Sequence, residues 1–184
     1  KQKSMDSMIY AIRAVESGGR ILEVSTKSRT PLGILLSGFE LLYDDQELGK
    51  GVPIVNVFES SKVFELGGPY RDLLHTTPVE AKRDERLVQS GKLLGFHYEG
   101  KEYTLQPRSL FYDWIYLHAL SAHPEYHEEI LEYDIFTDIE YSMSKMFANQ
   151  ARSLAYFVSL YRSDLLKEVL KDIESFKKIY TMTF

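Results

Sequence analysis

The stretch Val55-Asn56-Val57-Phe58-Glu59-Ser60-Ser61-Lys62-Val63-Phe64-Glu65-Leu66-Gly67-Gly68-Pro69-Tyr70 is the most informative part of the chain, because its apolar residues recur at helical spacing. Pro53 suits the first turn of this helix, and Gly67-Gly68 are expected to end it. Glu59 and Lys62 are three residues apart, a spacing that makes neighbours of two helical side chains. The stretch therefore predicts a helix that presents a carboxylate and an ammonium on one face.

Turn and capping signals divide the rest of the chain into further elements. The expected helices cover residues 5–15, residues 77–91 behind the capping box Thr77-Pro78-Val79-Glu80, a segment from Pro107 to just before His123-Pro124, and residues 126–184 with a polar break at 138–144. The expected strands are residues 21–25 and a hairpin over residues 93–105 that turns at Glu99-Gly100. We therefore predict a single α+β domain over residues 1–184, mostly helical with a small sheet or hairpin.

Composition limits the classes of function. The chain has 184 residues, 44% apolar residues and a net charge of −5, values that suit one globular domain and disfavour nucleic-acid binding by the surface as a whole. It contains no cysteine, which excludes disulfides, a thiol nucleophile and cysteine-ligated zinc. Its apolar runs are too short to span a membrane. We expect a cytoplasmic protein that needs no cofactor.

Three residues are candidates for a catalytic or binding site. A carboxylate can stabilise a cation or transfer a proton, and an indole ring offers a flat surface for stacking. Glu59, Asp138 and Trp114 supply these types. Each also has a structural interpretation: Glu59 with Lys62 as a solvated surface pair, Asp138 as a helix N-cap, and Trp114 as a core residue.

Two arginines are candidates to hold a diphosphate, because a guanidinium engages phosphate oxygens bidentately. They are Arg29, between two hydroxyl residues, and Arg152, after Gln150. His123 and His127 have the spacing of a helical metal pair, but the proline after His123 disfavours helical backbone there. We therefore predict no metal site.

Several short motifs follow one another in an order that resembles the NADAR proteins, which bind or cleave N-ribosides and ADP-ribose. The motifs are Leu36-Ser37-Gly38-Phe39, the segment from Phe58 to Lys62, Ala81-Lys82, Phe111-Tyr112-Asp113-Trp114, Phe136-Thr137-Asp138-Ile139-Glu140 and Gln150-Ala151-Arg152-Ser153. The resemblance covers residues 21–160. It is to the branch associated with DarT-type DNA ADP-ribosyltransferase toxins.

This resemblance implies an ADP-ribosyl N-glycohydrolase that frees a base, with guanine in DNA as the expected base, and that acts as an antitoxin. The implied partners are ADP-ribose, an ADP-ribosylated nucleobase or ADP-ribosylated DNA. Glu59 or Asp138 would stabilise the sugar cation or activate water, and Lys62 would orient phosphate or ribose. The implied substrate-binding residues are Arg29, Ser37, Phe39, Phe58, Trp114, Gln150 and Arg152.

One position departs from the NADAR pattern. The family helix carries its catalytic glutamate seven residues before the lysine, where this chain has Val55. Either Glu59 has taken over from one turn further along the helix, or the protein binds its ligand without cleaving it. A third alternative is an interaction protein whose periodic apolar run at residues 165–173 packs on a partner.

Overall fold

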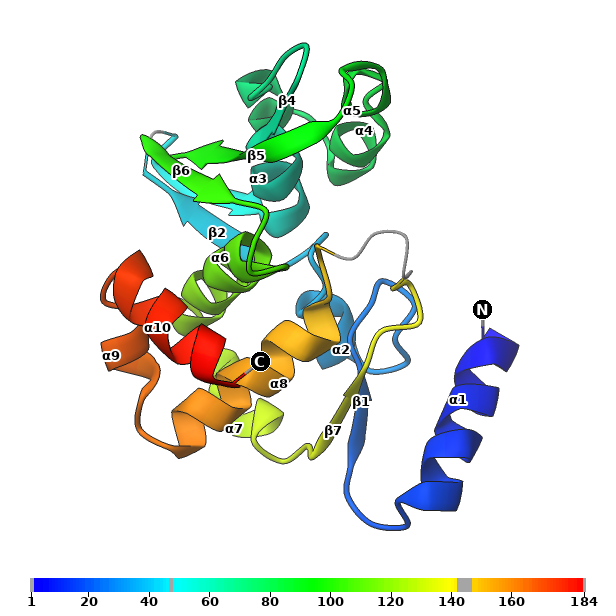
Figure 1. Ribbon diagram of the computed structural model, residues 1–184. Coiled ribbons are helices and arrows are strands. Elements are labelled where there is room, and N and C mark those ends of the chain that lie inside the picture. The colour runs from blue at the N-terminus through cyan, green and yellow to red at the C-terminus, as the bar shows by residue number, and fades with distance from the viewer. Residues whose placement is uncertain (1, 47, 142–146, 184) are drawn as a thin grey trace.

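The computed structural model describes residues 2–46, 48–141 and 147–183 and confirms the expected α+β class (Figure 1). The helices are α1 (Gln2–Val15), α2 (Pro31–Leu35), α3 (Ile54–Ser60), α4 (Pro78–Arg83), α5 (Arg86–Gln89), α6 (Leu110–Ser121), α7 (His127–Ile130), α8 (Gln150–Arg162), α9 (Leu166–Val169) and α10 (Ile173–Thr183), with 3-10 turns η1 (Arg71–His75) and η2 (Pro124–Tyr126). The strands are β1 (Ile21–Glu23), β2 (Leu42–Asp45), β3 (Lys50–Pro53), β4 (Lys62–Phe64), β5 (Leu93–Tyr98), β6 (Lys101–Thr104) and β7 (Ile135–Thr137). No helix in this described part of the chain is long and apolar enough to cross a lipid bilayer.

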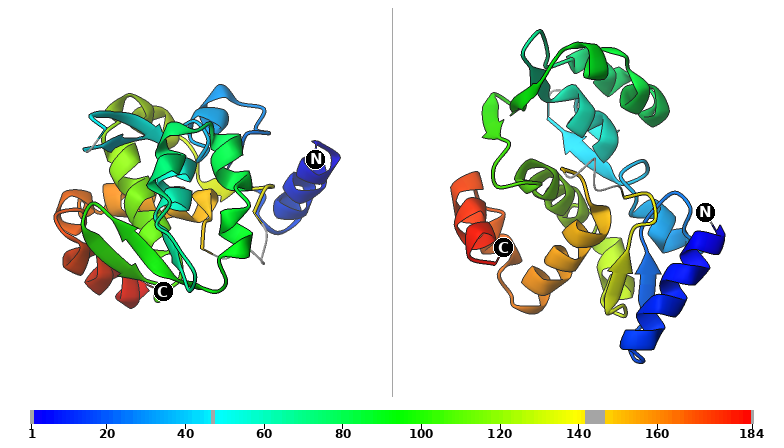
Figure 2. Two further views of the ribbon diagram at one scale, coloured as in Figure 1. Left: turned by 90° about the horizontal axis from the view of Figure 1, so that it is seen from above. Right: turned by 45° about the vertical axis from the view of Figure 1, so that its right-hand side comes forward.

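Helix α6 lies at the centre of the core. Ten of its 12 residues are buried, and a helix that is apolar on every side needs neighbours on every side. α3, β2, α8 and α10 all pack against it. Figure 1 and the right-hand view of Figure 2 show α6 between two groups of elements, with α3, α4, α5 and the β4–β5–β6 sheet above it and α8 and α10 below it.

Three small sheets surround this core. β1 and β7 pair in parallel, β2 and β3 form an antiparallel pair, and β4, β5 and β6 form an antiparallel sheet. In the β5–β6 turn, Glu99 and Gly100 both have positive φ, 47° and 71°, as the two central residues of a type I′ turn require. The predicted hairpin is therefore confirmed. The predicted N-terminal helix is also confirmed, as α1, and it lies alongside β1 (Figures 1 and 2).

The helix predicted from Pro53 to Gly67-Gly68 is wrong beyond Ser60. α3 ends at Ser60, and Lys62 begins β4. The Ser60 and Ser61 hydroxyls donate to the carbonyl of Val57 at 3.1 and 2.6 Å, and such side-chain bonds compete with continued helix. β4 then pairs with β5. Sheet pairing therefore overrides the helical spacing of the apolar residues.

The helix start predicted at the capping box is confirmed. The Thr77 hydroxyl accepts from the Glu80 N–H at 3.3 Å, and the Glu80 carboxylate accepts from the Thr77 N–H at 2.9 Å. The predicted continuation to Gly91 is wrong, because α4 ends at Arg83 and α5 begins at Arg86. The intervening Asp84 has ψ 126°, and its carboxylate accepts from the Arg86 N–H at 2.9 Å. The chain therefore changes direction at Asp84, between α4 and α5.

The end predicted for α6 before His123-Pro124 is confirmed, but the helix predicted from Tyr126 up to the polar break at 138–144 is wrong beyond Ile130. Residues 135–137 form β7, which pairs with β1. The pair brings together Glu23 and Thr137, 114 residues apart. A three-residue strand is too short to show a period of its own, so only its partner defines it.

The apolar run at residues 165–173 belongs mainly to the core. Val169 is fully buried, and Leu166, Leu170 and Ile173 pack against the core, while Leu165 stays exposed. The run therefore does not form the exposed apolar stripe that an interaction protein would present.

Candidate functional site

A cavity of about 400 Å³ opens in the domain, a size typical of small-ligand sites. It is lined by Gly38, Phe39, Val55, Phe58, Glu59, Lys62, Lys82, Leu87, Val88, Leu93, Tyr112, Asp138, Glu140, Tyr141, Phe147, Ala148 and Gln150. These residues come from α3 to α5 with β4 and β5, from the turn after α2, from α6, and from the segment around β7 and α8. Among them are five aromatic rings, three carboxylates and two ammonium groups.

The Glu59–Lys62 pair forms part of the cavity wall. The Lys62 Nζ lies 2.5 Å from a Glu59 carboxylate oxygen, and the two side chains are only 18% and 10% exposed. The same Nζ lies 4.8 Å from the centre of the Phe58 ring, a cation–π contact. The interpretation of a solvated surface pair is therefore wrong. The two residues meet across the junction of α3 and β4 rather than on one helix.

Asp138 enters the cavity from the turn after β7. Its carboxylate accepts from the Glu140 N–H at 2.9 Å, and the buried Glu23 holds the turn by accepting from the Thr137 hydroxyl at 2.5 Å and from the Ile139 N–H at 2.8 Å. Burial raises the pKa of Asp138 to about 6, although hydrogen bonds from the Glu140 N–H and Gln150 oppose the rise. Asp138 is therefore a candidate acid–base group near neutral pH.

Asp138 does not cap a helix. Residues 139–141, which follow it directly, are not helical. The next helix among the described residues, α8, begins at Gln150, and its N-cap is Asn149, whose side-chain oxygen accepts from the Arg152 N–H at 2.9 Å. The N-cap interpretation of Asp138 is therefore wrong.

Gln150 joins three segments of the cavity wall. Its side-chain oxygen accepts from the Gly38 N–H at 2.5 Å, and its side-chain nitrogen donates to the Val24 carbonyl at 2.9 Å. The Gly38 carbonyl in turn accepts from the Val55 N–H at 2.9 Å. Because both ends of the amide are bonded to the backbone, Gln150 fixes the shape of the wall that it lines.

Of the other residues predicted to bind substrate, Phe39 and Phe58 line the cavity. The Lys82 Nζ lies 4.9 Å from the centre of the Phe39 ring, so Lys82 adds a second ammonium beside an aromatic wall. Ser37 is fully buried behind this wall, and within the described residues its hydroxyl has no hydrogen-bond partner.

Arg29 and Trp114 are not among the residues that line the cavity. The Arg29 guanidinium lies 2.7 Å from the carboxylate of Asp6 on α1. The Trp114 ring packs against His118 and Phe176, with centroids 4.2 and 5.3 Å away, and is 7% exposed. The structure therefore places Arg29 against α1 and Trp114 in the core.

Arg152 also lies away from the cavity wall, in a buried polar network. Its guanidinium lies 2.5 Å from the Asp113 carboxylate, which also accepts from the hydroxyls of Ser153 at 2.5 Å and Tyr180 at 2.7 Å. Burial raises the pKa of Asp113, while the Arg152 charge and the three hydrogen bonds oppose the rise. The network ties α6, α8 and α10 together, as buried charges require such partners.

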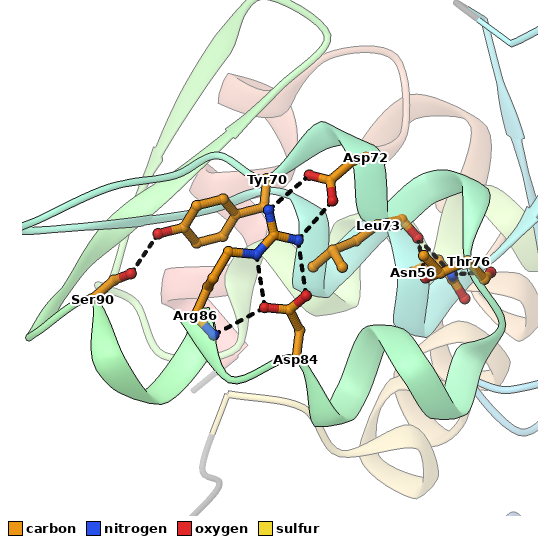
Figure 3. A network of polar contacts seen from close by, with 8 residues as sticks. All are labelled: Asn56, Tyr70, Asp72, Leu73, Thr76, Asp84, Arg86 and Ser90. Atoms are coloured by element: carbon orange, nitrogen blue, oxygen red, sulfur yellow. Dashed lines mark hydrogen bonds and ion pairs between the residues drawn. The ribbon is translucent and has the colours of Figure 1, made fainter.

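A second network holds the α4–α5 wall in place (Figure 3). Arg86 donates to Asp84 at 2.8 Å and to Asp72 at 2.6 Å, and its guanidinium lies 4.5 Å from the centre of the Tyr70 ring. The Tyr70 hydroxyl bonds to Ser90, at the end of α5. This network fixes the elements that carry Lys82, Leu87 and Val88 to the cavity.

The α3 side of the wall is tied to the same group. The Asn56 side chain donates to the Leu73 and Thr76 carbonyls at 2.8 and 2.9 Å (Figure 3). Thus α3 and η1 are held as one unit by a buried amide.

Within the described residues, no group of three or more His, Asp or Glu side chains is arranged to hold a metal ion. His123 contacts Glu125 at 2.9 Å, and the His127 ring bonds to the Leu120 carbonyl at 2.9 Å. The two histidines therefore have separate partners.

Tyr112 and Lys82 are among the cavity residues that sequence reasoning missed. Both stood inside motifs that the chain shares with the NADAR pattern, but neither was assigned a role at the site. Tyr112 looked like one apolar residue among many on a helix without an exposed face. Lys82 looked like an ordinary basic residue in the last turn of a helix.

Together these observations define an α+β domain whose cavity combines carboxylates, ammonium groups and aromatic rings. More particularly, the chain belongs to the family described as the DarT1-associated NADAR antitoxin, which matches residues 1–183. The family resemblance predicted from the sequence is confirmed, and it extends over almost the whole chain. No curated protein matches the sequence closely enough to count as a relative.

Proposed function

We propose that this protein is an ADP-ribosyl N-glycohydrolase that removes ADP-ribose from a modified base, with guanine in DNA as the expected base, and thereby reverses the action of a DNA ADP-ribosyltransferase toxin. One observation carries the proposal: Glu59 of α3 and Asp138 after β7, far apart in the chain, line one cavity with aromatic walls. Most glycosidases break a glycosidic bond with two carboxylates that flank it.

The proposed reaction breaks the bond between ribose C1 and the nitrogen of the base that carries it. Positive charge develops on the sugar, and the Glu59 carboxylate stabilises it. Asp138, with a pKa raised to about 6 by burial, donates a proton to the departing nitrogen. It then takes a proton from the attacking water, whose oxygen bonds to C1. Lys62 keeps the Glu59 carboxylate in place, 2.5 Å away.

Val55 favours a second candidate function, binding of ADP-ribose or a related nucleotide without turnover. It lines the cavity and is 7% exposed, at the position where the family resemblance implies a catalytic glutamate. A valine there neither moves a proton nor stabilises a cation. In this alternative the protein sequesters its ligand.

Calorimetric titration with ADP-ribose, beside a hydrolysis assay on guanine-ADP-ribosylated DNA, tests the proposal. We expect binding together with release of ADP-ribose, and loss of release in Glu59→Gln, which keeps the shape of the side chain. Glu102→Gln, at an exposed residue of β6, is the matched control and should retain activity. Binding without release would favour the second function, and absence of binding would contradict both.

A further inference from the structure

Tyr112 is a buried tyrosine at the wall of the cavity. It is 5% exposed and yet lines the cavity. Its ring packs edge-on against Phe58, with centroids 5.2 Å apart, and lies 6.1 Å from the ring of Tyr116. The ring is thus held firmly between α3 and its own helix, α6.

The hydroxyl of Tyr112 differs from other tyrosine hydroxyls of this protein. Five others are bonded to protein groups: those of Tyr43, Tyr70, Tyr98, Tyr116 and Tyr180. Tyr116, one turn further along α6, donates to the Leu36 carbonyl at 2.8 Å. Within residues 2–46, 48–141 and 147–183, the Tyr112 hydroxyl makes no such bond. The hydroxyl oxygen is not among the buried side-chain atoms that lack a partner, so it is accessible at the cavity that Tyr112 lines, and it can donate to a ligand there.

Gly38 leaves this hydroxyl open to the cavity. A Cβ atom at residue 38 would lie 2.9 Å from the Tyr112 hydroxyl oxygen and 3.3 Å from the Gln150 side-chain oxygen. The φ angle of Gly38 is not in the left-handed region, so the backbone itself does not require glycine here. The requirement is space beside the hydroxyl, at the wall that Gly38 and Tyr112 share.

The charges near this hydroxyl indicate what kind of atom accepts its proton. Burial raises the pKa of Tyr112 far above its ordinary value, and the charges of Asp138, Asp113 and Glu59 add to the rise. The phenol therefore stays protonated and acts as a donor. Because carboxylates repel a phosphate group, the acceptor beside them is a neutral oxygen.

We propose that the Tyr112 hydroxyl donates a hydrogen bond to an oxygen of the ribose that carries the modified base. This inference rests on the proposed function, because Glu59 and Asp138 then flank the same ribose. The anionic diphosphate is expected toward the Lys82 ammonium group, which lines the same cavity beside Phe39, because the Lys62 ammonium group is paired with Glu59. Tyr112 becomes a ligand-binding residue that the family match does not assign.

Tyr112→Phe tests this assignment, because it removes one oxygen and keeps the ring. We expect it to weaken ADP-ribose binding about 3- to 10-fold, the value of one hydrogen bond. ADP serves as the matched ligand, because it has the adenosine and the diphosphate but lacks the second ribose. Its affinity should be unchanged in Tyr112→Phe, as calorimetry of both ligands would measure.

Tyr116→Phe is the matched protein control on the same helix. It loses the bond to the Leu36 carbonyl, so its urea midpoint should fall while its ADP-ribose affinity stays that of the wild type. Tyr112→Phe should show the opposite pattern, with a urea midpoint at or above that of the wild type. Gly38→Ala, whose methyl group would crowd the hydroxyl, should also weaken ADP-ribose binding.

Several outcomes would overturn the inference. Equal ADP-ribose affinities of the wild type and Tyr112→Phe would mean that the hydroxyl makes no bond to the ligand. If Tyr112→Phe lost affinity for ADP and ADP-ribose equally, the contact would not be to the second ribose. A lower urea midpoint in Tyr112→Phe would mean that the Tyr112 hydroxyl bonds to a protein group, so that no ligand is needed to explain its position. A wild-type protein that binds neither nucleotide would contradict the proposed function and with it the ribose contact, whereas the other outcomes leave that function standing.

Discussion

The guanidinium of Arg152 lies 2.5 Å from the carboxylate of Asp113, in the interior where α6, α8 and α10 meet. Asp113 is fully buried, and Arg152 is 27% exposed in its side chain. The ion pair is therefore partly shielded from water, and its rupture leaves a carboxylate with no counter-charge.

Replacing this arginine should lower stability and leave ligand binding unchanged. Arg152→Met removes the cation beside Asp113, and we expect the free energy of unfolding to fall by about 3 kcal/mol, measured by urea denaturation. Arg83→Met, at an exposed residue at the end of α4, is the matched control. An Arg152→Met variant as stable as this control would show that the ion pair contributes nothing net.

The raised pKa of Asp138 predicts an unusual pH dependence of stability. Its pKa is about 6 in the folded protein and about 4 in an unfolded chain, so the folded state binds more protons between these values. The free energy of unfolding should therefore fall as the pH rises from about 4 to about 6. Asp138→Asn cannot ionise, should lack this fall, and should be more stable than the wild type at pH 7 by about 1–2 kcal/mol.

Urea denaturation at several pH values would measure this difference. Asp44→Asn, at an exposed carboxylate of β2, is the control and should follow the wild-type curve. Parallel curves for the wild type and Asp138→Asn would contradict the raised pKa. If Asp138 is also the proton donor, the rate of hydrolysis should fall above about pH 6, because the carboxyl must be protonated at the start of the reaction.

The Glu59–Lys62 pair should show a measurable coupling energy. Lys62→Met leaves a nearly buried carboxylate without its cation, and we expect it to destabilise the protein by about 2 kcal/mol. Glu59→Gln removes the charge that Lys62 neutralises. The double variant Glu59→Gln with Lys62→Met should therefore be less destabilised than Lys62→Met alone. A double-mutant cycle in urea should give a coupling of about 1–2 kcal/mol. A coupling near zero would mean that water screens the pair despite its burial.

Restoring a carboxylate at residue 55 tests whether the site is an eroded hydrolase. Val55 lines the cavity one turn before Glu59 on α3, so a glutamate there would face the same ligand. We expect Val55→Glu to raise the rate of ADP-ribose release about tenfold or more. Val55→Gln, of equal size but without charge, should not. Equal rates in the two variants would count against a lost glutamate at this position.

Local chemistry made several elements predictable from the sequence. The capping box at Thr77 and the turn at Glu99-Gly100 depend on residues within a few positions of one another, and both formed as expected. The site was partly predictable for a similar reason. Glu59 and Lys62 are neighbours in sequence, and both line the cavity with Asp138, Phe39, Phe58 and Gln150.

The rest depended on contacts between distant segments. β7 is a strand because it pairs with β1. α3 ends where the chain enters β4, which pairs with β5. Arg152 was a candidate to hold a diphosphate, but the structure places its guanidinium against the buried carboxylate of Asp113. Tyr112 gained a place at the cavity because Gly38, from another turn, leaves room for its hydroxyl.

By itself the sequence determined the class of the fold, the family and the helices and turns whose stabilising bonds span three or four residues. The tertiary structure alone decided which polar groups face the cavity and which serve the core. The physical reason is that a charged or hydroxyl side chain finds its partner by proximity in space, and burial then makes that partner costly to exchange.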